Sequence, residues 1–133
     1  MLTMRRETDY AIHLLKVLEK NKGGFISLRE LADETGISFL FLQKIARKLR
    51  ISRLIKAGAG VTGGYRLNKT AKQITLKMII EATEGPSGIL PCLCDKSKAH
   101  CKGAGKKCLL RNNLTKMNKK IVDILDKTKL SDM

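Results

Sequence analysis

The chain has 133 residues, and 43% of them are hydrophobic, which is enough for one domain with a modest core. It contains neither a run of about 18 apolar residues nor a signal-peptide pattern. We therefore expect a cytoplasmic location and no membrane partner. The 27 Lys and Arg residues against 12 Asp and Glu residues give a net charge of +15, which favours a nucleic acid as partner.

The first predicted helix covers 10–19. Its apolar residues recur at the spacing of a single helix face, and they are Ala11, Leu14, Leu15 and Leu18. The two glycines at 23–24 are expected to end this segment.

A helix–turn–helix is predicted next. Ser27 and Glu30 form the capping-box pattern of a helix start, and Gly36 ends that short helix. Ser38 begins a second helix that runs to about residue 50. Its predicted inward face consists of Phe39, Leu42, Ile45, Ala46 and Leu49. Its other faces are basic, which is typical of a helix that enters the major groove, although an ordinary helical hairpin gives the same pattern.

The residues after this helix favour the DNA-binding interpretation. Two short strands are predicted at 54–57 and 65–67, and the connection between them contains several glycines. A glycine-rich hairpin directly after a recognition helix is typical of the wing of a winged helix. Glycine permits the positive φ angles of a tight tip and a close approach to the DNA backbone.

The basic excess is concentrated in this region, because no acidic residue occurs between residues 35 and 80. The candidate DNA contacts are Ser38, Phe41, Gln43, Lys44, Arg47, Lys48, Lys56 and Arg66. Gln43 and Lys44 are the candidates for base contacts, while Lys56 and Arg66 are candidates for phosphate contacts. A solvated basic face is the alternative, and a membrane surface is disfavoured because glycines interrupt the block. Scarce aromatic residues favour double-stranded over single-stranded DNA.

Two further helices are predicted, one over 74–84 and one from about residue 108 onward. The second carries a heptad-like stripe of Leu110, Leu114, Met117, Ile121 and Ile124 or Leu125. The stripe is expected to pack against a second copy of the chain, although packing onto its own domain is the alternative. The predicted fold class is mainly α with a small β wing: a winged helix-turn-helix over 1–85, a cysteine-rich loop over 86–108, and a long dimerisation helix with the C-terminal tail over 109–133.

All four cysteines, Cys92, Cys94, Cys101 and Cys108, fall in the loop between these two helices. In a chain expected to be cytoplasmic, such a cluster favours metal binding or redox chemistry over disulfides. The gaps of one, six and six residues match neither paired zinc knuckles nor ferredoxin spacings. An iron–sulfur cluster is favoured, while a structural zinc site and a metal-free thiol sensor stay open.

An enzyme is not expected from this sequence. It contains no Cys-x-x-Cys pair, and no combination of Ser, His and an acidic residue stands out. The glycines at 58–64 lie between predicted strands, so they do not form a phosphate-binding loop before a helix.

Several motifs in order resemble one bacterial winged-helix family, which contains IscR, NsrR and CymR. They are Arg6-Glu7-Thr8-Asp9-Tyr10-Ala11, Ser27-Leu28-Arg29-Glu30-Leu31-Ala32, the helix from Ser38 to Leu49, Gly63-Gly64-Tyr65-Arg66-Leu67, Ile74-Thr75-Leu76, Ile80-Glu81-Ala82-Thr83-Glu84-Gly85 and the stretch from Leu125 to Leu130. The resemblance covers nearly the whole chain. It implies a homodimeric DNA-binding regulator that senses iron, redox state or nitric oxide, with RNA polymerase as a further candidate partner.

The resemblance also implies a ligand set for an iron–sulfur cluster, with two irons preferred over four. Cys101 and Cys108 correspond to the second and third cysteines of cluster-binding members. Cys92 is preferred as the first ligand, with Cys94 as a spare or alternative. The histidine that follows the third cysteine in IscR-like members is missing here, because residues 109–111 are Leu, Leu and Arg. Asp9 of the partner subunit matches the fourth ligand of NsrR-like members, although a helix N-terminal acid is equally expected at this position.

Overall fold

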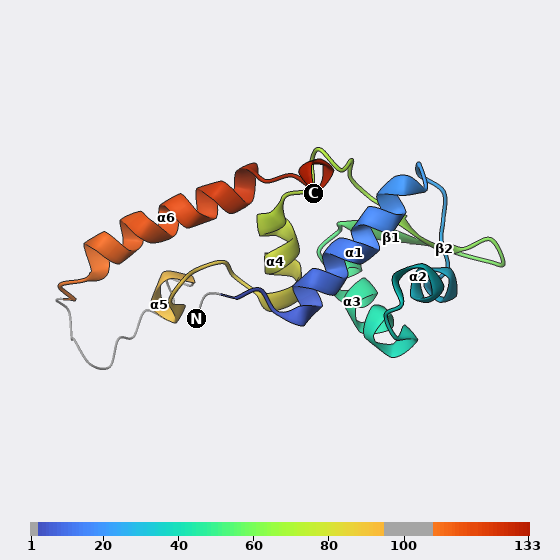
Figure 1. The fold of residues 1–133 in the computed structure, drawn as a ribbon, viewed down its shortest axis with the longest axis horizontal. Coiled ribbons are helices and arrows are strands. Elements are labelled where there is room, and N and C mark those ends of the chain that lie inside the picture. Colours follow the sequence, from blue (N-terminus) through green and yellow to red (C-terminus); the bar gives the residue numbers. More distant parts are fainter. Residues whose placement is uncertain (1–2, 95–107) are drawn as a thin grey trace.

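The computed structural model describes residues 3–94 and 108–133. In chain order its elements are α1 (Arg6–Lys20), α2 (Leu28–Thr35), α3 (Phe39–Ile51), β1 (Ile55–Gly58), β2 (Gly64–Leu67), α4 (Leu76–Glu84), the short α5 (Pro91–Cys94), α6 (Arg111–Lys127) and the 3-10 turn η2 (Leu130–Asp132). The elements from α1 to α4 form a head, and α6 projects from it (Figure 1). The predicted fold class, mainly α with a small β wing and a long C-terminal helix, is confirmed. Within the described ranges no helix is long and apolar enough to cross a membrane.

The head has one hydrophobic core to which every one of its helices contributes. α1 supplies Leu14, Leu15 and Leu18, and the predicted inward face of α3 is buried at Leu42, Ile45, Ala46 and Leu49. The prediction was wrong for Phe39, whose side chain is 46% exposed. Phe39 is the first residue of α3, and the helix begins beyond the edge of the core, so the same face meets solvent there.

Local hydrogen bonds start and end the two helices of the helix–turn–helix where the sequence predicts. The Glu30 backbone N–H donates to Ser27 Oγ at 3.2 Å, and the Ser27 N–H donates to Glu30 Oε2 at 2.8 Å. Gly36 ends α2 with φ of 69°, a left-handed conformation that glycine adopts without strain. Ser38 Oγ accepts from the Phe41 N–H at 3.4 Å and caps α3. The helix–turn–helix is thereby confirmed.

The predicted wing is the antiparallel hairpin β1–β2, in which Ile55 pairs with Leu67 and Gly58 with Gly64. Its base is joined to the segment before α2, because Ile26 and Tyr65 exchange backbone hydrogen bonds of 2.9 and 2.8 Å. Gly64 has φ of 146°, and a Cβ at this position would lie 2.3 Å from the Ile26 oxygen. Only glycine permits this close approach, so the wing is fixed to the head at that residue.

The end of the chain returns to the head beside the start of α4. The Leu76 N–H donates to the Thr128 oxygen, and the Leu130 N–H donates to the Ile74 oxygen, both at 2.9 Å. Leu130 is fully buried in the core. The last residues of the predicted segment 109–133 therefore take part in the packing of the head, which the periodicity of α6 did not indicate.

We expect Leu130→Ala to lower the free energy of unfolding by about 2–5 kcal/mol, because it leaves a cavity in the core. Met133→Ala is the matched control, since Met133 lies three residues further on and is 41% exposed. Urea denaturation followed by circular dichroism measures both variants. Equal stability of the two would contradict the anchoring of α6 through Leu130.

Candidate nucleic-acid interface and metal site

A depression of about 420 Å³ lies between the recognition helix α3 and the wing. It is lined by Leu40, Gln43, Lys44, Arg47, Arg50 and Tyr65. Three of these side chains are cations, and one of them, Lys44, forms an ion pair with Glu7 of α1. A concave basic surface on an exposed helix face is the form expected for contact with a duplex.

The structure brings Gln43, Lys44 and Arg47 together in this depression, as a shared DNA-facing role requires. Phe41 lies beside it, half-exposed, with its ring edge-on to that of Tyr10 at a centroid distance of 5.9 Å. Ser38 caps α3 through its side chain. The DNA contacts of these residues stay predictions.

Sequence reasoning missed three residues that line the depression: Leu40, Arg50 and Tyr65. Leu40 is 76% exposed and precedes Gln43, Lys44 and Arg47 by three, four and seven residues, so helical spacing alone could have found it. Tyr65 comes from β2, and only the position of the wing relative to α3 brings it here.

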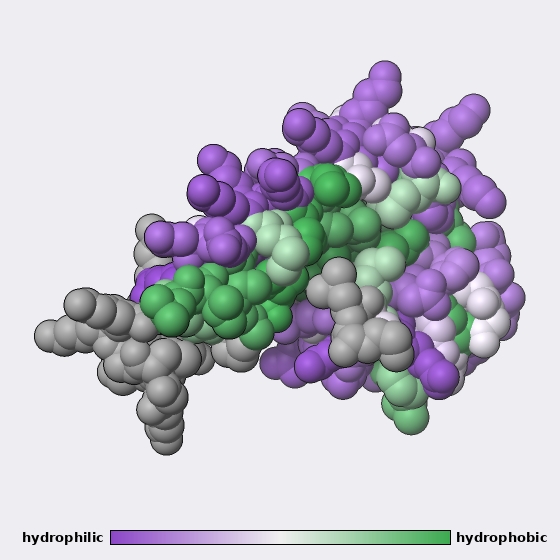
Figure 2. Space-filling view, turned by 60° about the vertical axis from the view of Figure 1, so that its left-hand side comes forward, coloured by the Kyte–Doolittle hydropathy of each residue, from purple (hydrophilic) through white to green (hydrophobic). Residues whose placement is uncertain are grey.

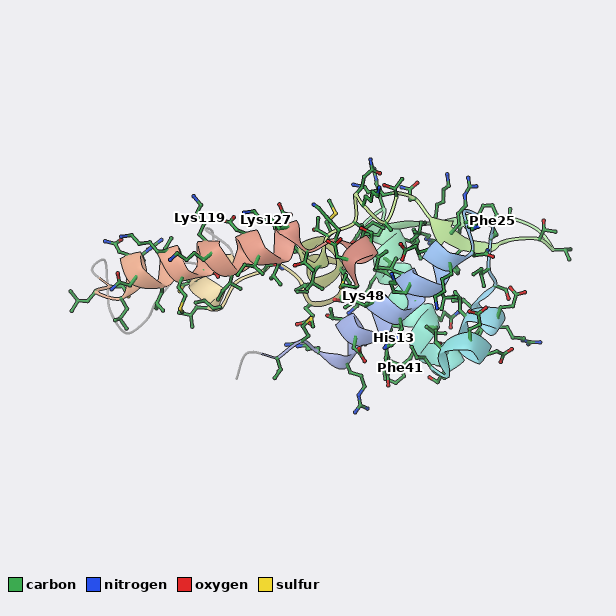
Figure 3. All side chains as sticks on the ribbon, turned by 45° about the horizontal axis from the view of Figure 1, so that its top comes forward. His13, Phe25, Phe41, Lys48, Lys119 and Lys127 are labelled. Carbon is green, nitrogen blue, oxygen red and sulfur yellow. The ribbon has the colours of Figure 1, made fainter. Side chains whose placement is uncertain are left out.

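Glu7, in the first turn of α1, contacts two lysines of the recognition helix. Its Oε1 accepts from Lys44 Nζ at 2.6 Å, and its Oε2 accepts from Lys48 Nζ. Lys48, labelled in Figure 3, also donates through Nζ to the Thr83 backbone oxygen in α4 at 2.8 Å. The hydrogen bonds from Lys44 and Lys48 lower the pKa of Glu7 from 4.5 to about 2. Lys48, predicted as a DNA contact, therefore links α3 to α1 and α4.

Thr8, in the first turn of α1, connects α1 to the end of α4. Its side chain is fully buried, and its hydroxyl lies 2.8 Å from the hydroxyl of Thr83. The Glu84 carboxylate accepts from the Thr8 hydroxyl and, at 2.9 Å, from the Arg5 N–H. The C-terminal end of α4 is thus joined by polar contacts to the beginning of α1 and, through Lys48, to the last turn of α3.

On the wing, Arg66 lies over the Phe25 ring, 4.7 Å from its centroid, and its Nη1 donates to the Gly23 oxygen at 3.4 Å. Its buried Nε has no hydrogen-bond partner within the described part of the chain. Lys56 stands directly opposite Arg66 in the hairpin register. Opposed like charges destabilise a hairpin, and an anion between them removes that penalty. This pair is consistent with the predicted phosphate contacts, which stay predictions.

The predicted metal ligands are described only in part. Cys92 in α5 and Cys108 before α6 are free thiols of intermediate exposure, while Cys101 lies outside the described residues and Cys94 is described only by its place in α5. Asp9 has a 61% exposed side chain and lies 3.5 Å from His13 Nε2. Over residues 3–94 and 108–133, no three His, Cys, Asp or Glu side chains come together.

The donor set nevertheless suits a soft metal centre. Thiolates are the ligands preferred by zinc and by iron–sulfur clusters. Residues 95–107 contain five lysines against one aspartate, a balance that would partly offset the negative charge of a thiolate-ligated centre. Four cysteines with this charge balance can supply the anionic sulfur ligands that such a centre needs.

Comparison with known proteins gives consistent matches. The family model described as "Rrf2: Iron-dependent Transcriptional regulator" matches residues 4–133. IscR of Pectobacterium carotovorum is 27% identical over 90% of this chain and 71% of that protein. NsrR of Bacillus licheniformis is 29% identical over 95% of this chain and 87% of that protein. The structure of CymR of B. subtilis superposes with a TM-score of 0.75 at 24% identity, covering 99% of this chain and 95% of that one, which shows a shared fold.

We expect Gln43→Ala to relax base preference at one position of the selected DNA site, because a bidentate amide contact with adenine discriminates by about 1–3 kcal/mol. Selection from a random duplex library, with the unchanged protein in parallel, measures the preference. Gln73→Ala removes the same side chain from the loop before α4 and serves as the control. An unchanged preference for Gln43→Ala would place the base contacts elsewhere.

The junction of Glu7 with its two lysines makes stability depend on pH in the acid range. The pKa of Glu7 is lowered in the folded state from 4.5 to about 2, so ionised Glu7 stabilises the folded protein. This stabilisation is fully present at pH values above 4.5, the pKa of Glu7 in the unfolded chain. This contribution is lost as the pH falls from about 4.5 toward 2. We expect urea denaturation of Glu7→Gln to show a smaller loss of stability over that interval than the unchanged protein. The same slope in both proteins would contradict the strength of these contacts.

Proposed function

The chain belongs to the Rrf2 family of transcriptional regulators, and from that membership we propose that its affinity for DNA is controlled by an iron–sulfur cluster bound at its cysteines. Relatives named IscR and NsrR are transcriptional regulators, so DNA binding rather than catalysis is the activity expected of the chain. The sensed signal is iron supply, redox state or nitric oxide.

The observation that carries the proposal is the place of the cysteines in the fold. Cys92 and Cys108 lie in the segment that leads from α4 to α6, and both are free thiols. Six residues, 85–90, separate the end of α4 from α5. The end of α4 in turn holds the recognition helix, because the Thr83 oxygen accepts from Lys48. A change in the cysteine segment therefore has a short structural route to α3.

The ligands we propose are Cys92, Cys101 and Cys108, with Cys94 as the alternative to Cys92, and Asp9 of the partner subunit. The carboxylate of Asp9 is exposed and lies 3.5 Å from His13 Nε2, so it is accessible to a second chain. When bound, an iron–sulfur cluster supplies iron that reacts with oxidants or nitric oxide. Asp9 lies on the same turn of α1 as Glu7, which contacts the recognition helix.

A homodimer through α6 completes this proposal. The exposed apolar side chains of this part of the chain include Leu110 at 63%, Met117 at 47% and Ile124 at 64%. Figure 2 shows hydrophobic surface running along the projecting part of the molecule, bordered by hydrophilic side chains. The segmentation into a DNA-binding head (1–85), a cluster loop (86–108) and a dimerisation helix with tail (109–133) belongs to the same proposal. The anchoring of Leu130 then fixes the dimer helix to the head.

Control by a ligand set shared between subunits works by coupling the positions of the two heads. A typical coupling between two sites is about 1–3 kcal/mol, which corresponds to roughly a 5- to 150-fold change in affinity. The cysteines and Asp9 of the partner subunit would hold the heads at one separation, and the release of these ligands would allow another. DNA half-sites have a fixed spacing, so affinity depends on that separation.

Anaerobic purification followed by iron, zinc and acid-labile sulfide analysis tests the cluster. We expect iron and sulfide in equal amounts with a visible chromophore that Cys101→Ala abolishes, because a thiolate ligand is lost. Cys92→Ala and Cys94→Ala decide between the two candidates for the first ligand. Asp9→Asn is expected to change the spectrum, while Asp33→Asn on α2 serves as the matched control.

The function is tested by comparing duplex binding of the loaded and metal-free protein, where an affinity difference within about 5- to 150-fold is expected. Zinc without sulfide would contradict the proposal and make the site structural. No metal after anaerobic reconstitution would also contradict it and leave a thiol-based regulator.

A further inference from the structure

The ion pairs of Glu7 with α3 have a consequence for how the protein distinguishes one DNA sequence from another. The segment from residue 36 to residue 79 contains no acidic side chain, so the recognition helix cannot neutralise its own cations. Glu7 comes from α1, and its side chain is 23% exposed at the side of the DNA-facing surface. It is the acidic residue that the described ion pairs place against α3.

The two lysines held by Glu7 differ in their environment. Lys48 is 32% exposed and has a second acceptor, the Thr83 oxygen at 2.8 Å, so it is held within the junction of the helices. Lys44 is 57% exposed, lines the depression beside Gln43 and Arg47, and is held by Glu7 at 2.6 Å. Lys44 is therefore the lysine that can leave Glu7 and contact DNA. Glu7 then still has Lys48 as an ion-pair partner.

The Glu7 carboxylate is held on both of its oxygens, because Oε1 accepts from Lys44 Nζ and Oε2 accepts from Lys48 Nζ. A lysine already paired with a carboxylate adds little to the attraction between the protein and DNA phosphates. Non-specific binding consists almost wholly of that attraction. Specific binding adds base contacts, and a contact of Lys44 with a base offsets the loss of its ion pair with the carboxylate.

We propose that Glu7 is a specificity-determining residue that competes with DNA for Lys44 and thereby lowers affinity for non-cognate duplexes more than for the cognate site. The carboxylate opposes Lys44–phosphate contacts on every sequence. The loss of the Glu7–Lys44 ion pair is offset only where a base accepts hydrogen bonds from the Lys44 ammonium group, as guanine can with its two major-groove acceptors. Specificity of this kind comes from a repulsive element directed at the wrong partners.

The test measures affinity against salt concentration for a duplex selected by the unchanged protein and for a scrambled duplex of equal length. All variants are compared in the same metal state, so the outcome does not depend on the proposed cluster. We expect Glu7→Gln to bind the scrambled duplex several-fold more tightly, with a salt slope steeper by about 0.9, as one further phosphate contact predicts. Affinity for the selected duplex is expected to change less, so the discrimination ratio falls.

Asp123→Asn is the control for the loss of one negative charge, because Asp123 lies on an exposed part of α6. It is expected to leave the discrimination ratio unchanged. The Lys44→Gln background provides a second check, since the effect of Glu7→Gln on the scrambled duplex should disappear there. Unchanged or weaker binding of the scrambled duplex by folded Glu7→Gln would overturn the proposal.

A comparison that keeps Glu7 intact guards against a variant that fails to fold. On the scrambled duplex, Lys44→Gln should leave the salt slope nearly unchanged, because Glu7 already neutralises that lysine. Arg47→Gln, on the same face of α3, should flatten the slope by about 0.9, as the loss of one phosphate contact predicts. Equal slopes for the two variants would overturn the proposal, as would the absence of salt-dependent binding by the unchanged protein.

Discussion

The short backbone pairing between the start of α4 and the end of the chain determines how the rest of the molecule is arranged. Ile74 and Leu76 bond to Leu130 and Thr128, so α4 begins and α6 ends at one place on the head. The two helices must then run away from this common base, and the residues between them must connect their far ends. α4 has 9 residues and α6 has 17, so α6 is longer than α4 by about 12 Å at 1.5 Å per residue. The cysteines lie in the connection between those far ends.

The far end of α4 is also the place where the polar junction of the head is built. Thr83 and Glu84 contact Lys48, Thr8 and Arg5, so the last turn of α4 joins the last turn of α3 to the beginning of α1. These contacts put the start of the cysteine-bearing connection and the support of the recognition helix on one helix turn. In this fold, a change at the cysteines can reach the DNA-binding helix through a short series of contacts. A two-state element that both sites influence is sufficient, and this helix turn is the candidate.

The parts of the fold that depend on neighbouring residues could be predicted from the sequence, and those that depend on distant contacts could not. Ser27, Glu30, Gly36 and Ser38 act through bonds within a few residues, so their pattern located both helices of the helix–turn–helix. Phe39 follows the periodicity of α3, but the core does not extend to the first turn of that helix. The burial of Leu130 and the stacking of Arg66 on Phe25 join segments far apart in the chain. No local pattern signals such contacts.

The candidate site divides in the same way. Gln43, Lys44 and Arg47 share one helix face, and spacing alone was sufficient to group them. The partner of Lys44 was not accessible to the same reasoning, because Glu7 lies 37 residues earlier and meets it only after α1 packs on α3. Counting charged residues therefore predicted correctly that the surface is positive, but it overestimated how many of its cations are free of an acidic partner.

α6 has an apolar face that the single chain does not cover. None of its 17 residues is fully buried, although Leu114, Ile121 and Leu125 are partly covered. Most helical stability in proteins comes from the packing of an apolar face against another element. Leu110, Met117 and Ile124 leave such a face open to solvent. A second copy of the chain presents the same face, so a symmetric pair would cover both at once and bring Asp9 of the partner subunit within a shared assembly with the cysteines. Dimer formation and completion of the proposed ligand set then become one event, which ties the stability of α6 to the state of the cysteines.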